Sequence, residues 1–188
     1  MRWPIFIFIL APLAVLWRCV FLGEVIGPWA EVRTFAPWSE AAPNRPYDVL
    51  QMDACLQFYV WRDLVFESWG KGQIPLWNPY SFGGAPLLAN SQSGALYPLH
   101  ILMGVLHVPT GMAVTLLAWF HLTWAGLGLF FLCRRLGGTD WGACLAGISF
   151  SLSAFMVSWT GLASVITTVA WIPWCLWAVV GLWSEEHW

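Results

Sequence analysis

Long apolar runs with almost no charged residues are the feature that most constrains this chain. Between Gln73 and Cys133 there is no Asp, Glu, Lys or Arg, and most charged residues lie between Glu24 and Lys71. Only 10% of all residues are charged, whereas soluble domains carry about 25%. A charge in hydrocarbon costs several kcal/mol. This distribution therefore indicates an integral membrane protein whose charged segment lies in water or in a polar cavity.

Hydropathy separates segments that could cross a bilayer from segments that are too short to do so. Apolar runs of about 20 residues predict transmembrane helices, and this chain has about four of them. They cover residues 4–22, 110–133, 141–159 and 165–183. Residues 99–108 form a shorter run that predicts a re-entrant or interfacial helix. Pro173 is expected to kink the last span, and the Gly, Ala and Ser residues of the third suit close helix packing.

Arginines beside these runs predict the orientation. Arg2 precedes the first run, and Arg134 and Arg135 directly follow the second. Arginine is enriched on the cytoplasmic side of membrane proteins, so the amino terminus is assigned to the cytoplasm and the intervening loop to the outer face. No small-x-small cleavage site follows the first run, which predicts an uncleaved span. The expected all-α organisation is a first transmembrane helix (1–22), an extracytoplasmic loop with interfacial helices (23–109), and three further transmembrane helices with a short cytoplasmic tail (110–188).

The loop contains one long stretch without proline, from Asp53 to Trp69. At helical spacing its aromatic and acidic side chains fall on different faces, although the acidic face also carries leucine and valine. The first face holds Phe58, Trp61, Val65 and Trp69, and the second holds Asp53, Asp63 and Glu67. This pattern predicts a helix along the membrane surface that ends at the glycines 70 and 72. Residues 74–98 are rich in Gly, Pro and Asn and predict irregular structure.

Asp53 is the first candidate for chemistry. It stands at the start of the predicted helix, where an aspartate often caps the unpaired backbone N–H groups. The other interpretation is a general base at the membrane surface. Asp63 and Glu67 share one helix face, and such a like-charged pair more often faces solvent than performs acid–base chemistry.

Cations and amides between residues 53 and 98 are candidates for binding. Arg62 and Lys71 are the only cations there. A lipid-phosphate substrate would need such groups, and the other interpretation is an interfacial anchor. Asn78, Asn90 and Gln92 carry neutral hydrogen-bonding groups within the charge-free stretch. They could bind a sugar or satisfy the backbone of an irregular loop.

Tryptophan, cysteine and histidine carry weaker signals. The sixteen Trp residues suit membrane–water interfaces. The five Cys residues are scattered without a metal-ligand spacing, so no metal is expected. His121 lies in the middle of the second run. We expect it to hydrogen-bond across helices, and the alternative is an axial ligand to a porphyrin or chlorin pigment. No basic patch indicates a nucleic-acid partner.

Several short motifs are similar to one known family. The motif residues in the loop are Asp53, Gln57, Tyr59, Trp61 and Arg62, then GQIPLWNPY from Gly72 to Tyr80, then Phe82-Gly83-Gly84 with Pro86, Asn90, Gln92, Ser93 and Tyr97-Pro98. The similarity extends to two later pieces, LCRRLG from Leu132 to Gly137 and WIPWCLW from Trp171 to Trp177. Together these motifs resemble the bacterial YfhO family over most of the chain from Asp53 to Trp183.

The resemblance implies a GT-C-type glycosyltransferase architecture in a bacterial inner membrane. Enzymes of this type use a polyprenyl-phosphate sugar as donor at the outer membrane face, and no further cofactor is implied. Asp53 matches the family's acidic position, which implies a role as base or in orienting the acceptor. Arg62, Asn78, Asn90 and Gln92 fall on motif positions. The implied acceptor is a cell-envelope polymer or lipid, so the expected partners are the bilayer and a lipid-linked sugar.

The resemblance covers only the amino-terminal part of that family, whose members are longer and have more spans. The first hypothesis is a glycosyltransferase-like module. A donor cavity of the GT-C type needs later helices, so both an active and an inactive form of this short chain stay open. The second hypothesis is a non-catalytic subunit of a larger membrane complex. In that case the loop and the Trp residues would dock against partner subunits, lipid or pigment.

Overall fold

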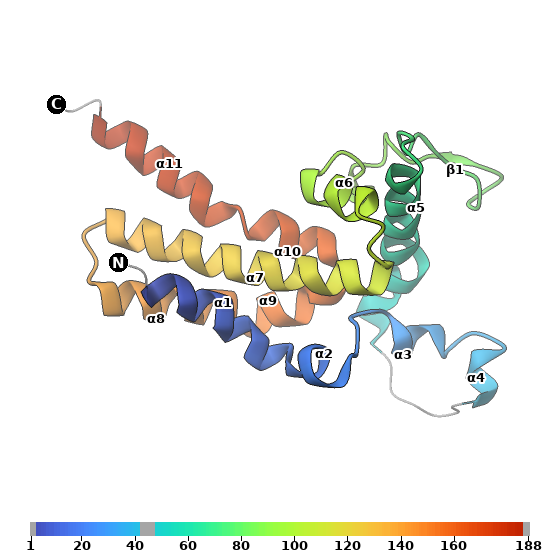
Figure 1. Cartoon of the computed structure of the whole chain (residues 1–188), viewed down its shortest axis with the longest axis horizontal. Helices are drawn as coiled ribbons and strands as arrows, with labels where there is room; N and C mark the ends of the chain where they lie inside the picture. Colours follow the sequence, from blue (N-terminus) through green and yellow to red (C-terminus); the bar gives the residue numbers. More distant parts are fainter. Residues whose placement is uncertain (1–2, 42–47, 186–188) are drawn as a thin grey trace. The chain divides into compact units, whose positions relative to one another are not determined.

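The computed structural model describes residues 3–41 and 48–185, most of which are helical. The chain divides into two compact units (Figure 1). The helical unit comprises Met1–Glu24 and Leu116–Trp188, and the loop unit comprises Val25–Thr115. The predicted helical class is therefore confirmed.

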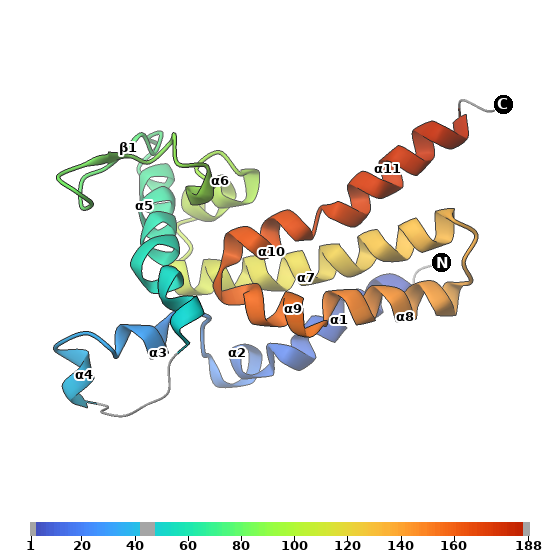
Figure 2. The same ribbon diagram turned by 180° about the vertical axis from the view of Figure 1, so that it is seen from behind.

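Eight helical segments build the described part of the helical unit. They are α1 (Trp3–Val15), α2 (Trp17–Leu22), most of α7 (Thr110–Arg135), α8 (Asp140–Ser151), α9 (Ala154–Ser158), the 3-10 turn η4 (Trp159–Gly161), α10 (Ala163–Val169) and α11 (Ile172–Glu185). Figures 1 and 2 show α7 running between α8 on one side and the pair α10 and α11 on the other. Helix α7 thus forms the centre of this unit.

Three stretches of the described chain are long and apolar enough to cross a membrane. They are Thr110–Arg135, Asp140–Gly161 and Ala163–Trp183. They coincide with the second, third and fourth apolar runs, so the prediction of three long apolar helical stretches is confirmed. A chain with three such helices has the composition of a membrane protein.

The first apolar run forms two helices instead of the expected single span. Leu16 separates α1 from α2, with φ −91° and ψ 18°. Helix α1 contains Pro12, which has no N–H to donate and removes one helical hydrogen bond. The 13 residues of α1 cover about 20 Å at 1.5 Å per residue, less than the ~30 Å hydrocarbon core. The fourth span therefore stays a prediction.

Two of the long apolar stretches are interrupted by identifiable residues. Between α8 and α9 the Ser153 hydroxyl accepts a hydrogen bond from the Met156 N–H at 3.3 Å, which starts a new helix. Between α10 and α11 the chain turns at Ala170 and Trp171. Pro173 follows this turn and cannot donate to the carbonyl of Val169. The kink predicted from Pro173 is therefore confirmed.

Glycines allow α1 to approach α7 and α8 closely. Phe8 of α1 is 1% exposed, and its ring centroid lies 5.8 Å from that of Phe130. A Cβ atom on Gly126 would lie 2.6 Å from the Phe8 ring, and one on Gly147 would lie 2.7 Å from it. The close packing expected from the small residues of the third run is therefore observed.

A tryptophan cluster, Trp124, Trp171 and Trp174, joins α11 to α7. The rings of Trp124 and Trp174 stack with centroids 4.3 Å apart, and Trp174 Nε1 donates to the Trp124 carbonyl at 2.9 Å. Trp171 meets Trp124 edge-on at 5.3 Å. Farther along the same pair of helices, the Arg135 guanidinium lies 4.6 Å from the Trp177 ring centroid. Each aromatic pair adds about 0.5–1.5 kcal/mol beyond its burial.

The loop unit consists of short elements around one longer helix. They are α3 (Trp29–Val32), α4 (Trp38–Ala41), the 3-10 turn η1 (Val49–Gln51), the π-helical turn η2 (Ala54–Phe58), α5 (Tyr59–Gly70), β1 (Trp77–Asn78), β2 (Ala85–Pro86), the 3-10 turn η3 (Ser91–Ser93), α6 (Pro98–Val105) and the start of α7. The helix predicted from Asp53 to Trp69 is confirmed as η2 with α5. The short helix predicted at 99–108 is confirmed as α6.

Helix α6 packs on α5 to form the core of the loop unit. The ring of His100 meets that of Phe66 edge-on at 5.5 Å, and both side chains are buried. Trp69 Nε1 donates to the Ala95 carbonyl at 2.8 Å. Gly104 is needed at this contact because a Cβ atom there would lie 2.6 Å from Trp69 Cβ and 2.8 Å from the Phe66 carbonyl oxygen.

Residues 74–87, named the hairpin, extend away from α5 in both views (Figures 1 and 2). Its two short strands pair antiparallel, with Trp77 opposite Pro86. Three consecutive residues at the tip have positive φ, namely Phe82 at 53°, Gly83 at 75° and Gly84 at 123°. This conformation strains a phenylalanine, and the Phe82 ring is fully exposed. Its large apolar neighbours Ile74, Leu76, Trp77 and Tyr80 are also exposed.

Candidate functional site

A cleft of about 560 Å³, named the amide cleft, lies between the hairpin and the helix formed by η2 and α5. Its walls combine apolar and aromatic side chains with three amides and one hydroxyl, and no wall residue is charged. The lining residues are Leu56, Gln57, Trp61, Asn78, Ser81, Phe82, Ala85, Pro86, Leu87 and Asn90. Ligand pockets commonly have this size and this mixture of apolar walls with a few polar groups.

Asn78 shapes the cleft from within the hairpin. Its side chain is 2% exposed. The Asn78 Oδ1 accepts from the Tyr80 N–H at 2.9 Å, and Nδ2 donates to Ser81 Oγ at 3.1 Å. Both ends of the Asn78 amide therefore stabilise the turn that carries Ser81 and Phe82. This agrees with the interpretation that Asn78 satisfies the backbone of an irregular loop.

Asn90 and Gln92 belong to the turn that follows the hairpin. The Asn90 side chain accepts from the Gln92 N–H at 3.2 Å and thereby caps η3. Asn90 also lines the amide cleft, whereas the exposed side chain of Gln92 does not. Of these two predicted binding residues, only Asn90 lies at the cleft.

Asp53 lies directly before η2 and does not act as a helix cap. Its backbone is helical, with φ −62° and ψ −28°, and its side chain makes no capping hydrogen bond. The exposed carboxylate is approached by Gln57 Nε2, at 3.4 Å from Oδ1. Since Gln57 lines the amide cleft, this contact connects the predicted acidic residue to the cleft wall.

The π-helical turn η2 sets the spacing between Asp53 and the cleft. Residues Ala54–Phe58 form this turn, and the Tyr59 N–H bonds to the Ala54 carbonyl, five residues earlier. Single π-helical turns are rare and frequent at functional sites. The wider turn changes the register of the helix between Asp53 and Trp61. No pattern of residue types predicts such a turn, so the sequence analysis missed it.

Arg62 is buried in the loop unit, with 2% of its surface exposed. Burial lowers the pKa of its guanidinium to about 10, so the side chain stays charged at neutral pH. Within the part of the chain that the structure describes, Nε has no hydrogen-bond partner. Arg62 lines neither the amide cleft nor the second cleft described next.

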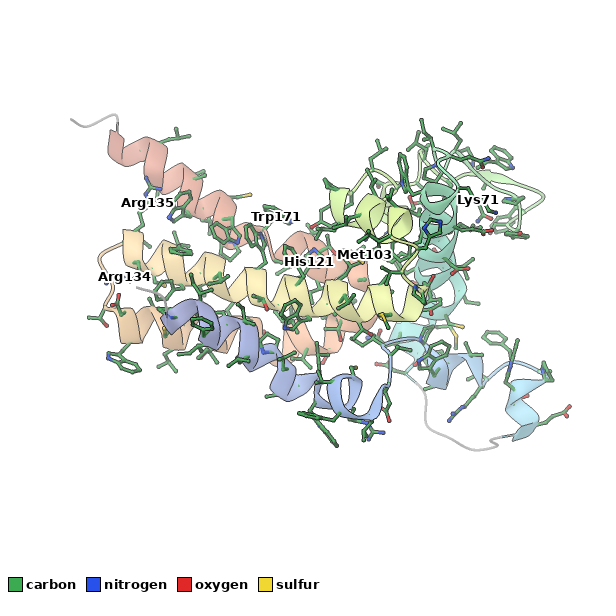
Figure 3. The ribbon with its side chains drawn as sticks, in the orientation of Figure 1. Lys71, Met103, His121, Arg134, Arg135 and Trp171 are labelled. Atoms are coloured by element: carbon green, nitrogen blue, oxygen red, sulfur yellow. The ribbon has the colours of Figure 1, made fainter. Side chains whose placement is uncertain are left out.

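Lys71 lies in a second cleft of about 340 Å³, named the charged cleft. Figure 3 shows Lys71 at the carboxyl end of α5. The lining residues are Asp63, Phe66, Glu67, Gly70, Lys71, Gly104, His107, Val108, Pro109 and Thr110. Lys71 forms an ion pair with Glu67, which raises the pKa of the lysine through a hydrogen bond and through charge attraction. The structure therefore separates Lys71 from Asn78 and Asn90.

Glu31 is a buried carboxylate that the sequence analysis did not single out. It lies on α3 and is 6% exposed, and Oε1 accepts from the Asp48 N–H at 3.4 Å. Burial, and then the negative charge of Glu31, raise the pKa of the Cys55 thiol. Only its position in the fold distinguishes this glutamate from the exposed Glu40.

The structure thus brings part of the predicted site together. Asn78 and Asn90 line the amide cleft, and Asp53 reaches its wall through Gln57. Arg62, Lys71 and Gln92 lie elsewhere in the loop unit. The cleft residues Gln57, Trp61 and Phe82 belong to the recognised motifs, but the sequence analysis did not predict them as binding residues.

His121, in the helical unit, is fully buried. Its Nδ1 lies 2.6 Å from the Leu117 carbonyl, one helical turn earlier. Within the residues that the structure describes, no group of three or more His, Cys, Asp or Glu side chains could hold a metal ion. The five cysteines are all free thiols.

Comparison with known proteins identifies no relative. No family model, no curated protein and no solved structure matches the chain. The similarity to the YfhO family stays a prediction from the motifs. The proposed function is therefore based on the geometry of the two clefts.

Proposed function

We propose that the loop unit is the sugar-binding part of a membrane glycosyltransferase of the GT-C type, similar to the YfhO family. The observation that carries this proposal is the amide cleft, which lies beside Asp53. Amides donate to and accept from sugar hydroxyls, and aromatic rings pack on the C–H faces of sugar rings. Gln57, Trp61 and Asn90 provide these groups around one neutral cavity.

The proposed reaction transfers the sugar of a polyprenyl-phosphate donor to a hydroxyl of a cell-envelope acceptor. The Asp53 carboxylate accepts the proton of the acceptor hydroxyl. The hydroxyl oxygen forms a bond to the anomeric carbon while the bond from that carbon to the phosphate oxygen breaks. Polyprenyl phosphate leaves with the electron pair. The exposure of Asp53 allows its proton to pass to water afterwards.

The predicted binding residues that lie outside the amide cleft are less well supported as contacts of the donor. Arg62, Lys71 and Gln92 stay predicted contacts of the donor phosphate or sugar. Lys71 supports the proposal least, because it lines the charged cleft and not the amide cleft. Arg62 supports it more, because its buried Nε has no hydrogen-bond partner among the described residues.

We further propose that the chain has four spans in a bacterial inner membrane, with the amino terminus in the cytoplasm and residues 23–109 outside. The support is the pair Arg134 and Arg135 at the end of α7. Arg134 forms an ion pair with Asp140 at 2.7 Å, so charges of both signs gather beyond this apolar helix. Such a group stays in water.

One observation favours the alternative, a non-catalytic subunit of a larger membrane complex. The hairpin exposes large apolar side chains around a strained Phe82, and such patches often mark sites where another protein binds. A pigment at His121 has less support, since the ring is fully buried.

Donor binding and sugar transfer by the chain in membranes test the proposal. Asp53→Asn should retain a labelled polyprenyl-phosphate sugar and lose transfer, because the amide cannot accept the proton. Trp61→Ala and Gln57→Ala should weaken retention of the donor. Glu40→Gln, a matched change of an exposed carboxylate in the same unit, should alter neither property. Donor retention that is equal in all four variants would overturn the proposal.

A further inference from the structure

The charged cleft lies at the point where the loop unit continues into a helix long enough to cross a membrane. Its residues His107 to Thr110 form the connection from α6 to α7, and Thr110 is the first residue of α7. If a helix crosses the hydrocarbon core, its first residue lies in the layer of lipid headgroups. Chain continuity therefore places this cleft in that layer.

One wall of the cleft carries charges of both signs in a row. Asp63 and Glu67 of α5 and Lys71, the residue directly after it, follow one another at intervals of four, which places them on one side. The side chains of Glu67 and Lys71 are 53% and 59% exposed. Exposed ion pairs of this kind contribute little to stability, so both partners can turn to a ligand. Asp63 is fixed, because Oδ1 accepts from the Thr110 hydroxyl at 2.5 Å.

His107 adds a hydrogen-bond acceptor to the cleft. His107 is held in a strained conformation with φ 53°, and its Nδ1 lies 3.0 Å from the Val105 carbonyl. A ring nitrogen at this distance from a carbonyl donates its proton, which leaves Nε2 of the neutral ring as an acceptor. A Cβ atom on Gly70 would lie 3.4 Å from this Nε2. The ring therefore lies over the backbone next to Lys71.

We infer that the charged cleft binds the phosphoethanolamine headgroup of a membrane phospholipid. A primary ammonium group has three N–H donors, and the carboxylate of Glu67 and Nε2 of His107 accept from it. The phosphate is bound by the ammonium group of Lys71. Phe66, Val108 and Pro109 offer apolar contact for the methylene groups. A choline headgroup has no N–H to donate, so this arrangement selects ethanolamine over choline.

The expected selectivity can be measured by native mass spectrometry of the full chain in mild detergent. The chain is mixed with phosphatidylethanolamine, phosphatidylcholine and phosphatidylglycerol of identical acyl chains. Phosphatidylethanolamine should be retained severalfold better than the other two. Soluble phosphoethanolamine in excess should displace it. Equal retention of the three lipids, or failure of phosphoethanolamine to compete, would overturn the inference.

Matched variants assign the selectivity to the cleft. Glu67→Gln should reduce retention of phosphatidylethanolamine to the level of phosphatidylcholine, and Lys71→Met should weaken retention of every phosphate lipid. The control is Glu24→Gln, which removes the carboxylate of another exposed ion pair, formed with Arg18 at 2.5 Å. If Glu67→Gln keeps the preference for ethanolamine, or Glu24→Gln loses it as well, the cleft is not the binding site. This test does not depend on sugar transfer.

Discussion

Replacement of Arg62 by methionine is expected to stabilise the loop unit. The guanidinium is buried without a hydrogen-bond partner at Nε among the described residues, and desolvation lowers its pKa to about 10. This fall corresponds to about 3 kcal/mol against the charged form. Since the pKa is lower in the folded state, the penalty is complete at neutral pH and is relieved only above about pH 10.

Methionine keeps an apolar stem in the same place and removes the charge. The shorter side chain leaves a small cavity, which costs roughly 1 kcal/mol. The expected net gain is therefore about 2 kcal/mol, within the range found when buried charges are replaced by apolar residues. Hydrogen exchange of the α5 amides in mild detergent measures this gain, and protection should rise roughly 30-fold.

Replacement of an exposed arginine distinguishes the effect of relieving a buried charge from the effect of removing any positive charge. Arg33 is an exposed arginine in the same unit, and Arg33→Met should change stability by less than about 0.5 kcal/mol. A loss of several kcal/mol in Arg62→Met would refute the reasoning, because it would mean that the guanidinium is paired in the folded protein. A gain in stability together with weaker donor retention would assign Arg62 a role in binding.

Three further outcomes follow from the packing and the site. Gly104→Ala should lower the hydrogen-exchange protection of the α5 and α6 amides roughly 5- to 30-fold. The reason is that the new Cβ atom meets Trp69 Cβ at 2.6 Å and the Phe66 carbonyl oxygen at 2.8 Å. Unchanged protection would contradict this contact. Ser153→Ala should destabilise α9 by about 1 kcal/mol through loss of the cap, visible as faster exchange at Met156 with α11 unaffected. Asp53→Asn should leave thermal unfolding unchanged, since the carboxylate is exposed and makes no capping bond; a lower melting temperature would indicate a structural role.

The helices of this chain are predictable from the sequence where an apolar run is uninterrupted or a proline marks a break. The uninterrupted apolar run before Arg134 predicts α7, and the break before Pro173 follows from the missing N–H of proline. The interruption at Ser153 was not predicted, because a serine inside an apolar run forms a cap only when the backbone has already left the helix. The separation of α2 from α1 at Leu16 has no clear signal in the residue types either.

Of the residues that line the amide cleft, the sequence predicted only Asn78 and Asn90 as binding residues, and it did not predict that they lie together. Asn78 and Asn90 are separated by the turn and second strand of the hairpin, and the fold of the hairpin and η3 brings them to one cleft. Lys71 follows α5 and so faces the connection from α6 to α7, a contact that depends on the close approach at Gly104. The π-helical turn after Asp53 and the burial of Arg62 are consequences of tertiary packing, which residue patterns do not encode.

The central claim is that a lipid-linked sugar binds in the amide cleft beside Asp53. Photo-crosslinking tests it directly, with a polyprenyl-phosphate donor that carries the reactive group on the sugar and peptide mapping of the adducts. Adducts are expected within residues 56–61 and 78–90, weakened in Trp61→Ala and unchanged in Glu40→Gln. Adducts confined to the charged cleft or to the helical unit, or no specific adduct, would contradict it.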